Sequence, residues 1–152
     1  MNNRIIKFRV WTGKEMIPWE KAWNTETRFA GLDKNQYINL VCAACLARGN
    51  NGFTALQFTG LLDKNGKEIY EGDIIKYIYG LNDTRTAAIE YGCYNDGEYV
   101  SRVDTYIVKT TQEWPLSDLI HGAEYNYGYA GQVKKNSVQI IGNIFENPKL
   151  IK

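Results

Sequence analysis

The chain has 152 residues, of which 44% are hydrophobic and 23% are charged, and its formal net charge at pH 7 is +1. This balance is ordinary for a globular protein with a real core, whereas a protein dedicated to duplex DNA usually carries a stronger basic excess. The three cysteines are an odd number, which argues against a secreted disulfide framework and favours reduced thiols.

The N-terminal residues lack the long apolar run of a signal peptide or a transmembrane helix. The longest nearly uncharged apolar stretch, residues 37–47, is too short to span a bilayer. We therefore predict a cytoplasmic protein with no membrane partner.

The first predicted strand covers residues 4–11, where apolar and polar residues alternate with a period of two. Lys7 and Arg9 share its polar face. They form either a small basic patch for phosphate or, more ordinarily, the charges of a solvated strand face. A turn at Gly13 then leads into a short second strand within residues 16–19.

The next part of the chain is less regular. Residues 20–36 are polar without a clear period, so a long loop or an ordered insertion is predicted there. Residues 37–41 are apolar and predict a buried strand, while residues 42–47 fit either its continuation or a short helix.

The middle of the chain carries the clearest pattern. Residues 53–59 alternate and predict a strand, and the sequence Asp-Lys-Asn-Gly at 63–66 follows it. Asn-Gly is a strong hairpin signal because both residues tolerate a positive φ. Residues 67–70 are then the return strand, and a tight turn at 71–73 precedes a further strand at 74–79.

The second half of the chain alternates polar turns with further predicted strands. These strands are predicted at residues 87–94, 98–101, 103–110 and 137–145. The first two flank the Asn-Asp-Gly turn at 95–97. Residues 80–86 predict a polar loop, and residues 114–120 predict one helical turn.

About eight short strands with turns every 8–12 residues predict a mainly β fold. The architecture would be a small barrel or a sandwich of short antiparallel strands, with at most short helical turns. No internal repeat and no low-complexity linker interrupts the chain.

Three blocks of the sequence stand in a distinctive order and spacing. They are IKFRVW at 6–11, QFTGLLDKNGKEIYEGDII at 57–75 and IGNIFENP at 141–148. Together they resemble the YopX family of phage and prophage proteins over the whole chain. The resemblance implies a mostly β, phage-encoded protein of the bacterial cytoplasm, in which residues 1–152 form one domain with candidate insertions at about 20–52 and 80–135. It implies no established activity and no catalytic residues.

Cys42 and Cys45 form a lone CxxC pair. Zinc needs four ligands, and only Cys93 and His121 remain as further candidates. A redox role would require a surrounding βαβ pattern, which the sequence lacks. Buried structural thiols are the better interpretation, so neither a metal nor a cofactor is predicted.

Glu71 and Asp73, with Glu68 nearby, form the best acidic cluster of the chain. Paired carboxylates can hold magnesium or act in acid–base chemistry. The favoured alternative is a solvated acidic turn in which Asp73 binds nearby backbone amides. His121, the only histidine, suits the end of a helical turn. No catalytic residue is predicted, and we lean against an enzyme.

Tyr125, Tyr127 and Tyr129 alternate with flexible residues, and Lys134 and Lys135 follow. Such loops form adaptable protein-binding surfaces. Aromatic rings beside positive charge also hold single-stranded nucleic acid, and rings of this kind can simply cover a core. The leading prediction is a non-catalytic protein-binding or self-associating module that uses these five residues. A nucleic-acid-binding small β-barrel is the alternative, and an uncharacterised enzyme is the second alternative.

Overall fold

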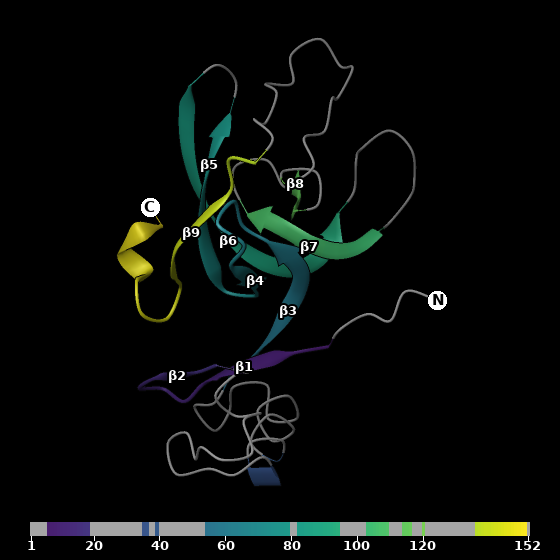
Figure 1. Cartoon of the computed structure of the whole chain (residues 1–152), viewed down its shortest axis with the longest axis vertical. Helices are drawn as coiled ribbons and strands as arrows, with labels where there is room; N and C mark the ends of the chain where they lie inside the picture. The colour runs from purple at the N-terminus through teal and green to yellow at the C-terminus, as the bar shows by residue number, and fades with distance from the viewer. Residues whose placement is uncertain are drawn as a thin grey trace. The chain divides into compact units, whose positions relative to one another are not determined.

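The computed structural model describes most of the segments that were predicted as strands. The described residues are 6–18, 35, 36, 39, 54–79, 82–94, 103–109, 114–116, 120 and 136–151. Their strands are β1 (Phe8–Trp11), β2 (Met16–Ile17), β3 (Thr54–Leu62), β4 (Glu68–Tyr70), β5 (Asp73–Tyr79), β6 (Asp83–Tyr94), β7 (Val103–Lys109), β8 (Trp114–Pro115) and β9 (Gln139–Asn143) (Figure 1). A short 3-10 helix, η1 (Pro148–Leu150), follows.

The described strands are antiparallel wherever their pairing is given, and they form two sheets, so the mainly β prediction is confirmed. The strand orders are β2-β1-β3-β4 and β8-β7-β6-β5-β9. The chain divides into two compact units, residues 1–58 and residues 59–152. In the described part of the chain, no helix is long and apolar enough to cross a membrane.

The first unit is organised around β1, which pairs with β2 on one side and with the beginning of β3 on the other. Val10 lies opposite Ile17, and both side chains are buried. Gly13 has a φ of +89°, and the Thr12 hydroxyl donates to the Glu15 carbonyl at 3.1 Å. These contacts close the predicted β1–β2 turn.

β3 is irregular where it enters the second unit. Gly60 has a φ of +86° inside the strand, a value that glycine adopts without the strain a Cβ would bring. The hydroxyl of Thr59 donates to the carbonyl of Ile69 at 2.8 Å and accepts from the amide of Leu61 at 3.2 Å. A side chain thus satisfies main-chain groups at this kink.

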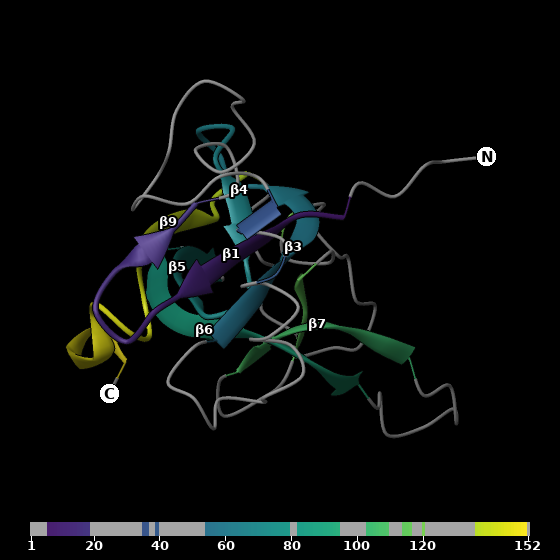
Figure 2. The same cartoon turned by 90° about the horizontal axis from the view of Figure 1, so that it is seen from below.

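The five-stranded sheet of the second unit is built around β6. Its first half pairs with β5 and its second half pairs with β7, and Figure 2 shows the second half running beside β7. Among the described pairs, Ala88 alone lies opposite residues of both neighbours, Ile74 on β5 and Lys109 on β7. β6 therefore links the two halves of the sheet.

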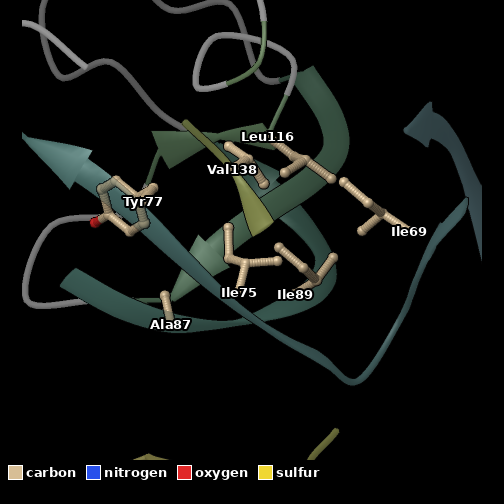
Figure 3. Packing of buried hydrophobic residues seen from close by; sticks show 7 residues of the cluster. All are labelled: Ile69, Ile75, Tyr77, Ala87, Ile89, Leu116 and Val138. Atoms are coloured by element: carbon tan, nitrogen blue, oxygen red, sulfur yellow. The ribbon is translucent and has the colours of Figure 1, made fainter. Parts of the chain in front are cut away.

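The core of the second unit lies on one face of β5 and β6. Its seven buried residues pack together in Figure 3: Ile69, Ile75, Tyr77, Ala87, Ile89, Leu116 and Val138. Ile75 and Tyr77 alternate with the exposed Lys76, as the period of two predicts. Each fully buried isoleucine contributes roughly 1.5–3 kcal/mol to stability.

The polar loop predicted at 80–86 is wrong for residues 83–86. β6 begins at Asp83, which lies opposite Tyr79 of β5. Arg85 donates to Asp83 at 2.8 Å, and its guanidinium lies 3.8 Å from the centre of the Tyr79 ring. The hydrogen bond with Asp83 raises the pKa of Arg85. These polar residues fit a strand because most of this stretch is exposed to solvent.

Two predictions for short apolar segments also need correction. Asn39, in the segment predicted as a strand at 37–41, has a helical backbone. In the segment predicted as a helical turn, Trp114–Pro115 is a strand paired with β7, and only Leu116 and Ile120 of the described residues are helical. A short apolar run has no period that separates a buried strand from a buried helix.

Candidate functional site

The acidic cluster predicted around Glu71 and Asp73 lies at the turn between β4 and β5, where Asp73 is buried and Glu71 is half-buried. Asp73 is 1% exposed, and its Oδ2 accepts from the amide of Tyr70 at 2.8 Å. The hydroxyl of Tyr70 donates to Glu68 Oε2 at 2.8 Å. The carboxylate of Asp73 therefore closes the turn between β4 and β5. This confirms the predicted bond to a backbone amide, but the prediction of a solvated turn is wrong for Asp73, which is buried.

Gly72 joins the same turn to the rest of the second unit. Its amide donates to the carbonyl of Ile89 at 2.8 Å, and its carbonyl accepts from the amide of Ile144 at 2.9 Å. The backbone has a φ of +75°, and a Cβ here would lie 3.3 Å from the ring of Phe145. Both the conformation and the crowding favour glycine at this position.

Asp63 organises the β3–β4 hairpin. Its Oδ1 accepts from the amides of Asn65 at 2.8 Å and Lys67 at 2.9 Å, and its Oδ2 accepts from the amide of Ile140 at 3.2 Å. Burial raises the pKa of this carboxyl, but the hydrogen bonds from Lys67, Ile140 and Asn65 outweigh burial and hold the pKa below its ordinary value. Asp63 is therefore a charged turn residue.

The main chain of this hairpin confirms the turn predicted from Asp-Lys-Asn-Gly. The amide of Gly66 donates to the carbonyl of Asp63 at 2.9 Å, and Gly66 has a φ of +79°. The amide of Lys64 donates to the carbonyl of Val138 at 2.9 Å. The turn is thus bound both to itself and to the segment that leads into β9.

A third polar turn ends β9. Oδ1 of Asn143 accepts from the amides of Phe145 at 3.0 Å and Glu146 at 2.9 Å, and its Nδ2 donates to Glu146 Oε2. Asn147 bonds both main-chain groups of Asn143: its Oδ1 accepts from the amide at 3.3 Å and its own amide donates to the carbonyl at 2.9 Å. A Cβ on Gly142 would lie 2.6 Å from Asn147 Oδ1.

The polar groups that the structure buries therefore serve the backbone. Asp63, Asp73 and Asn143 bind main-chain amides, and the Ser137 hydroxyl accepts from the amide of Ile78 at 3.1 Å. Among the described residues, no group of three or more His, Cys, Asp or Glu side chains is placed to hold a metal. The arrangement stabilises turns, which is the role that Asp and Asn commonly have there.

The predicted partner-binding residues lie outside the part of the chain that the structure describes. These are Tyr125, Tyr127, Tyr129, Lys134 and Lys135. His121, Cys42 and Cys45 also lie outside it, while Cys93 is on β6 at the register position opposite Asp104. The contact surface predicted at 125–129 stays a prediction.

An exposed aromatic residue on β6 was not singled out by the sequence. Tyr91 is 55% exposed, although it follows the buried Ala87 and Ile89 at a spacing of two along the strand. Residues at this spacing point to the same face. Tyr91 thus continues the core-forming face of β6 into solvent, and Tyr106 of β7 occupies the register position opposite it.

The basic pair predicted on the first strand is only partly exposed. Lys7 and Arg9 both have intermediate burial, and the ammonium of Lys7 lies 5.5 Å from the centre of the Phe58 ring. This is a cation–π distance. The aliphatic stem and the charge of Lys7 thus cover an apolar residue of the first unit.

The fold defines a mainly β protein whose buried polar residues form turns. The model of the YopX protein family matches residues 7–152, so the chain belongs to the YopX family. The chain is similar to a solved structure, that of protein EF1440 from Enterococcus faecalis, with 22% identity and a TM-score of 0.48, covering 97% of this chain and 99% of that chain. No curated protein matches the chain.

Proposed function

We propose that this YopX family member is a non-catalytic protein-binding or self-associating module, encoded by a phage or prophage and acting in the bacterial cytoplasm. The observation that carries the proposal is the exposure of Tyr91, which continues the core-forming face of β6. Aromatic side chains bury a large area on contact and are enriched in protein interfaces. A tyrosine that is 55% exposed on a strand is suited to anchor a partner.

The bonding of the acidic residues supports a non-catalytic role. Asp73 and Asp63 are 1% and 6% exposed, and each binds main-chain amides. A general base has to reach the proton that it abstracts, within hydrogen-bond distance or through one water molecule. Carboxylates enclosed in turns in this way are better suited to stability than to chemistry on a substrate.

The segment around Tyr125, Tyr127 and Tyr129 provides further tyrosine side chains that could contact a partner. Tyrosine provides rigid contact area with a polar end, and Gly and Asn let a loop adapt to its partner. Lys134 and Lys135 would add charge at the rim of such a contact. We propose these five residues as further partner-contacting positions.

The test compares the full-length chain with three variants: Tyr91→Ala, the double variant Tyr127→Ala/Tyr129→Ala, and Leu62→Ala as the control. Leu62 is also an exposed apolar residue, at 48%, but it lies at the end of β3. Self-association is measured by sedimentation velocity, and partner capture is measured from bacterial lysate with and without nuclease. We expect Tyr91→Ala or the double variant to weaken association at least about tenfold, as for an interface hot spot. Leu62→Ala should leave it unchanged.

The outcomes separate the functional classes. Unchanged association in both tyrosine variants, with circular dichroism showing that they are folded, would reject the proposed surface. Capture that nuclease abolishes, and that weakens steeply as salt rises, would favour a nucleic-acid-binding protein instead.

A further inference from the structure

β9 is an edge strand of the five-stranded sheet, with β5 as its neighbour on the other side. An edge strand presents main-chain amides and carbonyls that can pair with a strand of another molecule. Natural edges are commonly protected by charged side chains or by proline. The five residues of β9, QIIGN, include neither, so the protection of this edge must come from elsewhere.

The β3–β4 hairpin covers the beginning of this edge. The carbonyl of Val138, directly before β9, accepts from the amide of Lys64 at 2.9 Å. Two residues further on, the amide of Ile140 donates to Asp63 Oδ2 at 3.2 Å. Main-chain groups of alternate residues point to the same side of a strand. Lys64 and the carboxylate of Asp63 thus stand where the next strand would bind.

Asn147 covers the other end of the edge. It bonds both the amide and the carbonyl of Asn143, the last residue of β9. The lack of a side chain at Gly142 permits this approach, since a Cβ there would lie 2.6 Å from Asn147 Oδ1. Groups from outside the strand therefore cap both ends of β9: the Lys64 amide and the Asp63 carboxylate at one end, and the amide and side chain of Asn147 at the other.

We propose that Asp63 and Asn147 are edge caps that keep β9 from pairing with β9 of a second copy of the chain, and that the uncapped strand is a strand-addition surface. Strand addition gains its affinity from main-chain hydrogen bonds and needs little sequence complementarity. Two identical antiparallel edges also satisfy each other around a two-fold axis, which closes the dimer. A second copy is therefore the occupant that fits this edge. The inference concerns a different surface from Tyr91 and does not rest on the proposed function.

The experiment compares full-length wild type with Asp63→Ala and Asn147→Ala. Sedimentation equilibrium gives the dissociation constant of self-association, and hydrogen exchange measured residue by residue by NMR gives the protection of the Ile140 amide. We expect each variant to self-associate at least tenfold more tightly than wild type. In Asp63→Ala the Ile140 amide should exchange fast in dilute solution and become protected as the protein concentration rises.

Ile89→Val is the matched control, because it removes one methyl group from the core of the same unit and leaves the side chains of Asp63 and Asn147 in place. The dissociation constant of self-association of Ile89→Val should equal that of wild type when the two proteins are compared at an equal folded fraction. If Asp63→Ala does not fold, the self-association of Asn147→Ala and Asp63→Asn tests the proposal instead. Folded variants that associate no more tightly than wild type would overturn the proposal. The proposal would also be overturned if the variants associated more tightly but hydrogen exchange of the Ile140 amide did not depend on protein concentration. Association would then proceed through another surface, such as the one around Tyr91.

Discussion

At the scale of single residues, buried side-chain oxygens take the place of main-chain carbonyls. Asp63, Asp73 and Asn143 each sit at a turn and accept hydrogen bonds from main-chain amides. All three belong to the blocks that resemble the YopX family. The distinctive residues of these blocks therefore describe how the chain turns, and a fold fingerprint of this kind does not define an activity.

The depressed pKa of Asp63 makes a prediction about pH. A carboxyl whose pKa is lower in the folded state stabilises the protein above its unfolded pKa, near about 3.9, and this stability is lost as the pH falls through the folded pKa. Asp63→Asn should lower the free energy of unfolding by about 2 kcal/mol at pH 7. The difference from wild type should shrink below about pH 4. Urea unfolding of both proteins across this range measures it, and a difference independent of pH would contradict the assignment.

Two glycines at turns allow backbone strain to be separated from crowding. Gly66 and Gly72 have similar positive φ values, +79° and +75°, but only Gly72 would place a Cβ against Phe145. Gly66→Ala should cost about 1 kcal/mol from the left-handed backbone alone. Gly72→Ala should cost at least about 1 kcal/mol more, because the Phe145 ring has to shift. Denaturant unfolding measures both losses, and equal losses would show that the ring moves freely.

At the scale of elements, the sequence predicts strands well where the alternation is strict and the turn residues are diagnostic. The strand over residues 74–79 and the hairpin turn at 63–66 are of this kind. The prediction fails where the polar residues of an exposed strand are interpreted as a loop. Residues 83–86 are polar because the strand is exposed there, not because it is absent.

The residues of the candidate site also divide into those that a local sequence pattern predicts and those that it does not. The turn role of Asp73 could be predicted from its neighbours, because its bond reaches only three residues back along the chain. The bond between Asp63 and Ile140 joins residues 77 positions apart, and no local pattern contains it. The exposure of Tyr91 could not be predicted from the sequence either, because it depends on where the core ends and not on the period of β6.

At the scale of the whole molecule, the chain has two compact units that share one strand. β3 begins in the first unit and ends in the second, with Gly60 just past the boundary. We propose that residues 1–152 nevertheless unfold as one domain. β3 is continuous in sequence across both units, and a protein of this size commonly unfolds in one cooperative transition.

One substitution in each unit tests this proposal. Val10→Ala removes buried volume from the first unit and Ile89→Ala removes it from the second. Each should lower stability by about 2–4 kcal/mol, as is typical of large-to-small core changes. In one cooperative domain, calorimetry should show a single transition that both variants shift. Two transitions, each moved by only one of the variants, would show that the units unfold independently.

The place of β9 in the chain has a consequence for the order of folding. β5 and β6 are consecutive in the chain and Tyr79 lies opposite Asp83, so the two strands can pair within microseconds. The pairing of Ile75 with Ile140 must instead close a long loop, which is slow and costs entropy. During synthesis, β5 therefore waits for β9 on the order of seconds. For that time the outer edge of β5 is open to chaperones and to other nascent chains, because β9 can complete the sheet only after the long segment between the two strands has been made.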